Sequence, residues 1–143
     1  MDLQKDFHKY NLITGWGVFL IALLTYGLSV EPTVSFWDCG EYIATSAKLE
    51  VGHPPGAPFF QMVGAFFASF SPSPEKTALF VNFISVFSSA FTILFLYFII
   101  VNFTKKIALS SKETLTNAQV IGLYGSGGVG ALAYTFSDSF WFN

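Results

Sequence analysis

Charge is what this sequence lacks most. Only 11% of its 143 residues are Asp, Glu, Lys or Arg, and none of them is Arg, whereas about 25% is usual in a soluble domain. So small an ionic surface excludes soluble globular and disordered proteins, and the absence of a basic patch excludes a nucleic-acid partner. The single cysteine, Cys39, excludes an internal disulfide and a metal cluster built from cysteines alone.

What the sequence has instead is apolar: 52% of its residues are hydrophobic, 19% are aromatic, and the mean hydropathy is +0.54. Stretches without Asp, Glu, Lys or Arg cover 10–30, 77–104 and 114–137. Each can cross a hydrocarbon core of ~30 Å as a helix. The composition therefore predicts an all-α membrane protein with spans at about 11–30, 78–103 and 118–136. The cores of these spans hold no Asp, Glu, Lys, Arg or His, which argues against a transporter or channel.

The first span has an alternative interpretation, because Lys5 and Lys9 precede it as they would precede a cleaved signal peptide. Its length and the lack of a clear small-x-small site favour a retained anchor. A fourth uncharged stretch, 51–74, is broken by Gly and Pro, and its apolar part, 57–70, is only about 21 Å long as a helix. It predicts an interfacial or re-entrant helix.

The lysines predict the orientation, because cytoplasmic loops carry an excess of them. With the N-terminus inside and 57–70 not crossing, the inside holds Lys5, Lys9, Lys105, Lys106 and Lys112, and the outside holds only Lys48 and Lys76. Residues 31–77 then form one long outside loop with five acids and two lysines. We expect the chemistry of the protein in this loop.

The first half of the loop predicts an amphipathic surface helix over about 38–50. Its polar face holds Asp38, Glu41, Tyr42 and Thr45, together with Leu49. The spacing of Asp38 and Glu41 places two carboxylates on adjacent positions of one face, but the same spacing is that of a capping box. Both interpretations remain open at this point.

The second half of the loop contains Gly52-His53-Pro54-Pro55-Gly56, which predicts a stiff turn. A lone histidine in a loop is more often solvated than functional, but His53 faces the same compartment as the acids. Cys39, His53, Asp38 and Glu41 could compose a metal site, although their spacing does not require one. We predict no metal and no cofactor, and leave a divalent ion open.

Glycines are frequent between 122 and 130, without the Gly-Lys-Ser/Thr ending of a phosphate-binding loop. Gly122, Ser126 and Gly130 recur every four residues, as do Ala118 and Gly122. This spacing predicts a stripe of small residues for close packing between membrane helices.

Trp37-Asp38-Cys39-Gly40-Glu41-Tyr42, followed by Gly52-His53-Pro54-Pro55-Gly56, resembles a bacterial family of multi-spanning membrane proteins described as a domain of unknown function. Its animal relative is a membrane O-mannosyltransferase of plexin-type receptors. The likeness runs through nearly the whole chain, including the stretch from Asn82 to Val101 within the second span and the closing stretch from Ser137 to Asn143. It implies that residues 1–143 are the N-terminal part of one longer transmembrane domain.

More distantly, the motifs are similar to those of the C-type glycosyltransferase superfamily. That likeness implies a transmembrane bundle with amphipathic surface helices in the first outside loop. It also implies transfer of a hexose, mannose by the closer relationship, from a polyprenyl-phosphate carrier to Ser/Thr of an exported protein. The expected location is the bacterial inner membrane, with the loop in the periplasm. Several relatives have adjacent acids, whereas Asp38 and Glu41 are three apart.

The resemblance implies roles for particular residues. Asp38 is the expected general base, and Glu41 is expected to hold the acceptor or to orient Asp38. Among the substrate-binding residues, Tyr42 would stack on sugar, and Lys48 and His53 would meet the phosphate beside Pro54 and Pro55. The alternative is a non-catalytic membrane scaffold or assembly subunit, whose loop only binds partners.

Overall fold

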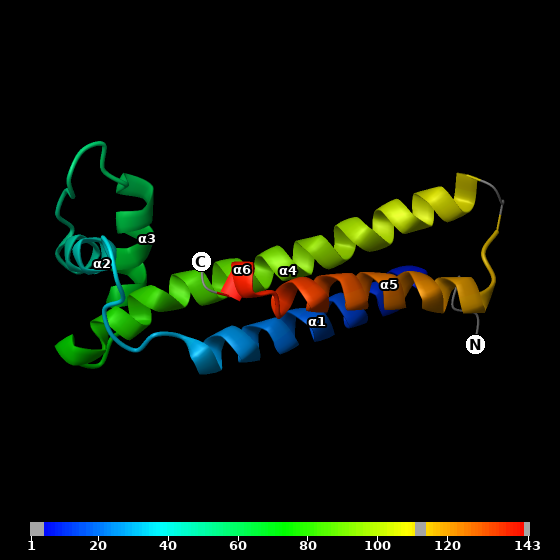
Figure 1. Cartoon of the computed structure of the whole chain (residues 1–143), viewed down its shortest axis with the longest axis horizontal. Coiled ribbons are helices and arrows are strands. Elements are labelled where there is room, and N and C mark those ends of the chain that lie inside the picture. Colours follow the sequence, from blue (N-terminus) through cyan, green and yellow to red (C-terminus); the bar gives the residue numbers. More distant parts are fainter. Residues whose placement is uncertain (1–4, 111–113, 142–143) are drawn as a thin grey trace. The chain divides into compact units, whose positions relative to one another are not determined.

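The computed structural model describes residues 5–110 and 114–141, and every regular element among them is helical (Figure 1). The elements are α1 (Phe7–Ser29), α2 (Cys39–Lys48), α3 (Pro58–Ala68), the 3₁₀ turn η1 (Pro74–Lys76), α4 (Thr77–Ser110), α5 (Asn117–Thr135) and α6 (Asp138–Trp141). The predicted all-α class is confirmed over this part of the chain. Lys112, Phe142 and Asn143, which entered the sequence predictions, lie outside the described residues.

Two helices of the described chain are long and apolar enough to cross a membrane: α1, and α4 together with η1. They coincide with the first two expected spans, although α4 continues to Ser110, past Lys105 and Lys106. Lysine is a good helix former, so the helix does not end where the apolar run ends. The third expected span forms α5, whose glycines and polar residues make it less apolar. Its crossing of the membrane stays a prediction.

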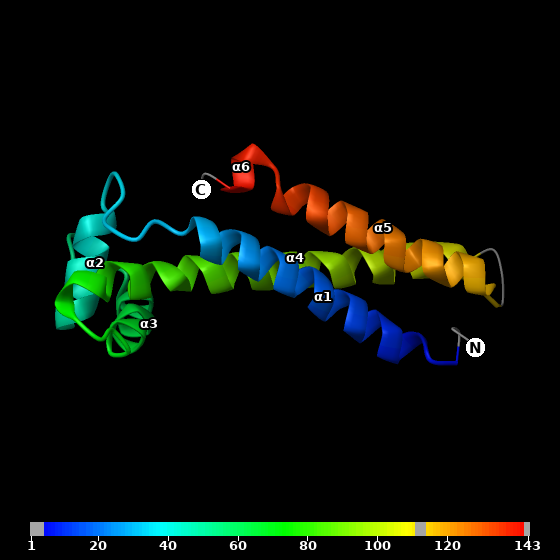
Figure 2. The same ribbon diagram turned by 90° about the horizontal axis from the view of Figure 1, so that it is seen from below.

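The chain divides into two compact units. The first combines residues 1–26 with 89–143, and its helices α1, α4 and α5 are joined by contacts at both ends. At one end, the Tyr124 hydroxyl donates to the Phe7 carbonyl (3.0 Å), and Lys105 Nζ lies 3.9 Å from the centroid of the Phe7 ring. At the other end, the Tyr26 hydroxyl donates to the Thr135 carbonyl (3.1 Å). Within this unit α4 therefore runs antiparallel to α1 and α5 (Figure 2).

The packed face of α5 differs from the predicted stripe. Its buried residues are Val120, Leu123, Gly127, Ala131 and Thr135. A Cβ on Gly127 would lie 3.0 Å from the Tyr97 ring, whereas a Cβ on Gly122 would meet nothing within 4 Å. Ala118, Gly122 and Ser126 are exposed and take no part in this packing, whereas Gly130 approaches Ile100. A role of the three in packing against other membrane helices stays a prediction. Spacing alone did not distinguish between two adjacent faces of α5 that both carry small residues. The face that packs also carries the larger Val120 and Leu123, which are buried.

The second unit, residues 27–88, positions the loop between the first two spans. Its core joins α2 and α3 to the first turns of α4, with Ile43, Ala78 and Val81 buried against Phe60, Ala68 and Ile84. In the same unit, Asn82 Nδ2 on α4 donates to the carbonyls of Glu31 (2.9 Å) and Thr33 (3.0 Å). These two hydrogen bonds hold the segment that leads from α1 to α2.

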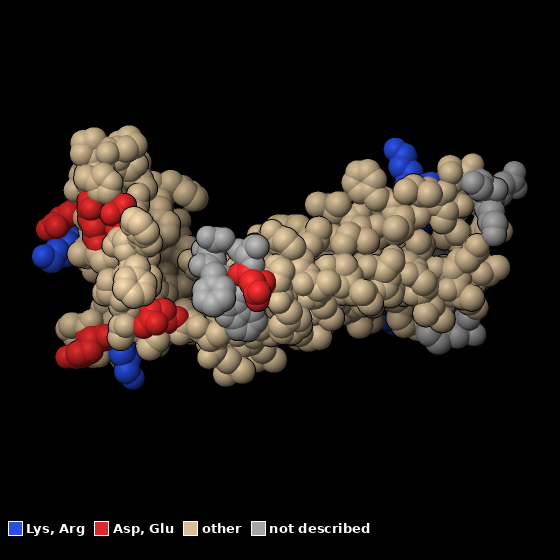
Figure 3. Space-filling view, viewed as in Figure 1, with Lys and Arg blue, Asp and Glu red and all other residues tan. Residues whose placement is uncertain are grey.

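Helix α3 exposes apolar residues and buries a polar one, which is the reverse of an amphipathic helix on the surface of a soluble protein. Gln61 and Gly64 are its buried residues, whereas Phe59, Met62 and Phe66 are 81%, 68% and 61% exposed. These three lie on one face, at positions i, i+3 and i+7. An outward apolar face and a buried glutamine suit a helix that touches lipid rather than water. On the face drawn in Figure 3, carboxylates gather over the second unit, while the surface of the long helices of the first unit carries little charge.

Candidate functional site

The site begins where α2 begins. Asp38 is the N-cap residue, and its carbonyl accepts the Tyr42 N–H (3.0 Å), but its carboxylate makes no capping hydrogen bond. The capping box predicted for Asp38 and Glu41 is therefore wrong, because the Glu41 side chain turns to another partner. Phe36 and Trp37, just before Asp38, are 88% and 97% exposed. Trp37 has φ +64°, a backbone conformation that bulky residues rarely adopt.

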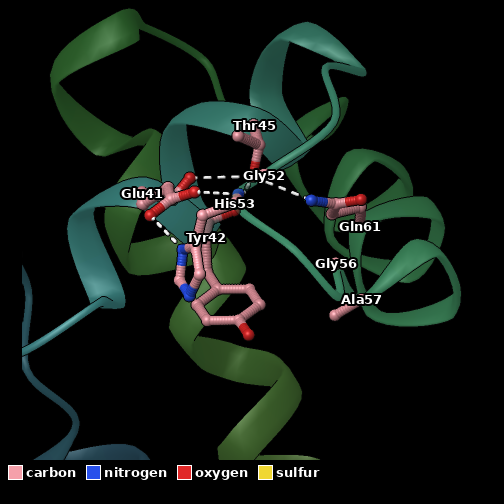
Figure 4. Close-up of a pocket in the computed structure, with 8 residues that line it drawn as sticks. All are labelled: Glu41, Tyr42, Thr45, Gly52, His53, Gly56, Ala57 and Gln61. Atoms are coloured by element: carbon pink, nitrogen blue, oxygen red, sulfur yellow. Dashed lines mark hydrogen bonds and ion pairs between the residues drawn. The ribbon is translucent and has the colours of Figure 1, made fainter.

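The partner of Glu41 is His53, 12 residues further along the chain (Figure 4). Oε1 of Glu41 accepts the His53 backbone N–H at 2.6 Å, and Oε2 lies 2.7 Å from Nδ1 of the imidazole. Both carboxylate oxygens are thus engaged by one residue. This pair fastens the turn that follows α2 to the first turn of the helix.

His53 is also fixed through its carbonyl, which accepts the Gly56 N–H at 2.8 Å. The Pro54–Pro55 peptide bond is cis, so residues 53–56 form the type of turn that has a cis proline at its third position. Gly56 has φ +75°, which glycine adopts without strain. The stiff turn predicted from the sequence is confirmed, and Pro54 and Pro55 lie exposed in it.

A second layer supports the pair from α3. Gln61 is 6% exposed, and its Nε2 donates to Thr45 Oγ1 at 3.3 Å. The Thr45 hydroxyl itself donates to the Glu41 carbonyl at 2.8 Å. The prediction of Thr45 on the water-facing side of α2 is wrong, because it is buried against Gln61. Gly52 lies between these groups, and a Cβ there would be 3.0 Å from Glu41 Oε1 and 3.2 Å from Gln61 Nε2.

Two neighbouring hollows flank Tyr42, whose ring packs edge-on against Phe60 at 5.4 Å between centroids. The first, around Glu41, His53 and Gln61, is tightly filled by its own side chains. The second is a groove of about 390 Å³ among α2, α3 and the start of α4. Its lining is mostly apolar, with Ile43 and Phe60, and Asn82 adds a polar group. Tyr42 and Ala57 line both, so the groove is continuous with the surface of the pair.

The electrostatic effects that Glu41 and His53 exert on each other favour the state in which the carboxylate and the imidazole are both charged. The His53 backbone N–H, followed by its side chain, lowers the pKa of Glu41. The hydrogen bond and charge of Glu41 raise the pKa of His53, and the charge of Asp38 adds to this effect. Since Glu41 and His53 side chains are 38% and 52% exposed, solvent screens their attraction, and their main role is to fix geometry.

The structure brings together three of the predicted site residues, Glu41, Tyr42 and His53, with Asp38 one turn before them. Lys48 lies exposed in the last turn of α2, about two turns from Glu41. Cys39 accepts a hydrogen bond from the Ser35 hydroxyl at 3.1 Å. Among the residues that the structure describes, no three His, Cys, Asp or Glu side chains could hold one metal ion.

Gln61 and Gly64 of this frame were missed by the sequence analysis, which named Thr45 only as part of a polar helix face and Asn82 only within the family resemblance. Gln61 and Asn82 had a usable signal, since each is an amide within an otherwise apolar stretch. Gly64 had none, because its role is to let the side chain of the buried Ser46 approach α3.

Fold and site together indicate a membrane protein that is helical in its described residues, with the carboxylate of Glu41 on α2 paired to the imidazole of His53 in the turn between α2 and α3. The chain belongs to the family described as "Protein O-mannosyl-transferase TMEM260 N-terminal domain", whose profile matches residues 38–143 and so begins at Asp38. The relationship to the animal O-mannosyltransferase, predicted from the motifs, is confirmed.

A curated relative is the "Protein O-mannosyl-transferase tmem260" of Dictyostelium discoideum. It is 30% identical over 81 residues, which are 56% of this chain and 10% of that protein. The match thus covers about a tenth of the relative's length. No solved structure matches the chain.

Proposed function

We propose that this chain carries part of the catalytic site of a membrane O-mannosyltransferase. The enzyme moves a hexose, mannose by its family, from a polyprenyl phosphate to a Ser or Thr hydroxyl of an exported protein. Asp38 takes the hydroxyl proton as the hydroxyl oxygen attacks C1 of the sugar. The bond from C1 to the phosphate oxygen breaks, its electron pair stays on the phosphate, and the configuration at C1 inverts.

The observation that carries this proposal is the state of the Asp38 side chain. If the Asp38 carboxylate had only a structural role, it would cap α2, but this carboxylate makes no capping hydrogen bond. It is exposed at the start of α2, at the first residue of the family match. An exposed carboxylate that is not used by its helix has the access that a general base needs.

The neighbouring groove supports a lipid-linked donor. Its apolar lining suits an isoprenoid chain, while His53 and Tyr42 lie at the end where a phosphate and a sugar would project. A departing phosphate needs a cation or hydrogen-bond donor, which His53 supplies in this proposal. Lys48 is a second cation on the same helix. No cofactor is needed for this step.

We place the loop at 31–77 outside, with the surface helices at the membrane interface and the N-terminus in the cytoplasm. The apolar outward face of α3 supports its contact with the bilayer. Lys105, at the same end of the first unit as Phe7, supports a common cytoplasmic side for these segments. The bacterial inner membrane is the proposed location, from the resemblance alone.

The experiment uses the full-length protein, expressed in a host from which its gene has been deleted. O-glycans on exported proteins are profiled by mass spectrometry for wild type, Asp38→Asn and Glu50→Gln. Asn retains the size of Asp but cannot take the proton. Glu50 provides the matched control, because it is an exposed carboxylate beyond the far end of the same helix.

We expect wild type and Glu50→Gln to restore the glycans and Asp38→Asn to abolish them at equal protein level. Equal restoration by Asp38→Asn would remove Asp38 from the mechanism. Glycans that respond neither to deletion nor to rescue would favour the alternative, a non-catalytic scaffold whose loop binds partners.

A further inference from the structure

The Glu41–His53 pair has a property that the proposed transfer does not by itself require. Glu41 was expected from the sequence to hold the acceptor or to orient Asp38, but both of its oxygens are occupied by His53. A carboxylate with two short hydrogen bonds to one residue is poorly placed to exchange them for a substrate. Its contacts instead fix the position of an imidazole ring.

The orientation of the ring follows from these contacts. Nδ1 faces Glu41, so Nε2, on the opposite edge of the ring, points away from the carboxylate (Figure 4). Within the part of the chain that the structure describes, Nε2 has no hydrogen-bond partner, and the side chain is 52% exposed. The backbone on both sides of the ring is held as well, by Glu41 and by Gly56. Nε2 of His53 is therefore held in a fixed position, pointing away from Glu41.

The charge on the ring decides what Nε2 can do. A neutral imidazole that donates from Nδ1 has a bare acceptor at Nε2, whereas an imidazolium donates from both nitrogens. Glu41 favours the imidazolium, and Asp38 acts in the same direction. Helix α3 presents only uncharged residues to the turn, among them Gln61. Over the pH range in which the ring is charged, Nε2–H is an outward hydrogen-bond donor.

We propose that Glu41 is a positioning residue, whose two bonds to His53 present Nε2–H to a phosphate oxygen of the lipid-linked donor. This inference rests on the proposed function, since that function supplies the phosphate. The proton stays on the imidazolium throughout, so the contact is a charge-assisted hydrogen bond and no covalent step is added. The phosphate sits beside Tyr42, and its isoprenoid chain enters the groove lined by Ile43 and Phe60.

The test measures binding of farnesyl phosphate to the purified full-length protein in detergent by isothermal titration calorimetry. The variants are Glu41→Gln, His53→Gln and the double variant, with Glu50→Gln as the matched control. Gln at 41 can accept the His53 backbone N–H but lacks the charge that stabilises the imidazolium. Thermal unfolding of each variant confirms folding, and His53→Gln tests the contact even where Glu41→Gln fails to fold.

We expect each single substitution to weaken binding about tenfold, the effect of losing one charge-assisted hydrogen bond. The double variant should bind no more weakly than His53→Gln, because Glu41 acts through the histidine. Wild-type affinity should fall as pH rises through the titration of His53. In Glu41→Gln this fall in affinity should occur at lower pH, because the carboxylate charge that stabilises the His53 imidazolium has been removed. The control should bind as wild type does.

Several results would overturn the inference: unchanged binding in Glu41→Gln, additive losses in the double variant, or affinity that rises with pH. The last would make the pair a base rather than an anion-binding group. Inorganic phosphate that competes at concentrations comparable to farnesyl phosphate would replace the lipid donor with free phosphate. The proposed function fails separately, when Asp38→Asn retains transfer, whatever the binding measurements give.

Discussion

The close contact between α2 and α3 offers a prediction whose size follows from the structure. A Cβ on Gly64 would lie 2.6 Å from the Cβ of Ser46 and nearer still to its hydroxyl. Favourable carbon–carbon contacts lie at about 3.5–4.0 Å, so Gly64→Ala must push the helices apart by about 1 Å or more. Ser46 is fully buried and has no long side chain that could move aside.

Overpacking of this kind costs about 1–3 kcal/mol. That range corresponds to a roughly 5- to 150-fold shift of the docking equilibrium between α2 and α3 toward the undocked form. Because Ile84, which packs in one core with Ile43 and Phe60, lies 3.9 Å from the position of a Cβ at Gly64, the groove beside Tyr42 should loosen as well. We expect lower thermal stability of the second unit and weaker support for Glu41.

The assay exploits Cys39, the single cysteine of the chain, which is partly buried in the first turn of α2. Its rate of maleimide labelling in the full-length protein, read at the peptide level by mass spectrometry, reports how often α2 undocks. Gly64→Ala should raise the rate, and Gly128→Ala, whose Cβ would meet nothing within 4 Å, should leave it unchanged.

A compensating change makes the reasoning refutable. Ser46→Gly removes the Cβ that Gly64→Ala would strike, so the double variant should label more slowly than Gly64→Ala alone. A Gly64→Ala variant that labels like wild type would refute the steric argument. So would a double variant in which the two effects simply add, since the clash would then not be their common cause.

The remaining predictions concern both units. Gly127→Ala should lower the melting temperature of the full-length protein by several degrees, through its clash with Val101 and Tyr97, whereas Gly122→Ala should be neutral or slightly stabilising. Tyr97→Phe should change the free energy of unfolding by no more than about 1 kcal/mol in denaturant titration, because the buried hydroxyl has only Thr14 as a neighbouring hydrogen-bond group and makes no well-formed hydrogen bond among the described residues. Protection of the His53 amide against hydrogen exchange, corrected for the intrinsic rate, should be greatest at pH values between the pKa of Glu41 and the pKa of His53. It weakens as pH falls through the lowered pKa of Glu41, below 4.5, and as pH rises through the raised pKa of His53, above 6.5. Protection independent of pH would contradict the pairing.

Periodicity and charge predicted where α1 to α5 lie in the sequence, because local composition decides where such helices form. That α1, α4 and α5 cross a membrane stays a prediction. The ends of α2 and α3 fall within two residues of the expected ones: α2 ends where Leu49 takes the left-handed conformation, and α3 begins with Pro58 in its first turn. The face of α5 that packs was not predictable in the same way. Two small-residue faces are adjacent there, and only the neighbouring helix α4 selects between them.

The sequence analysis named Glu41, Tyr42 and His53, which the structure brings together, but it did not predict the contact between Glu41 and His53. That these residues form a functional site stays a prediction. The loop sequence indicated Asp38, Glu41 and His53, because acids and a histidine were expected in one compartment. It could not indicate that Glu41 would leave its helix terminus for His53, since a local capping box competes with a contact 12 residues away. Tertiary geometry decides that competition. Gly52 allows the contact between Glu41 and His53, because glycine has no Cβ that would displace the Glu41 carboxylate.

The two hydrogen bonds from Asn82 have a consequence for how the chain is made. They hold the backbone of residues 31–33, which precede the site, but they come from a helix that follows it. During synthesis, the segment leading into α2 therefore cannot be secured until the second long apolar helix has emerged. The residue that holds this segment is thus made about fifty residues after it. A nascent chain that stops before Asn82 therefore contains the motif residues without the two hydrogen bonds that hold the segment leading into α2.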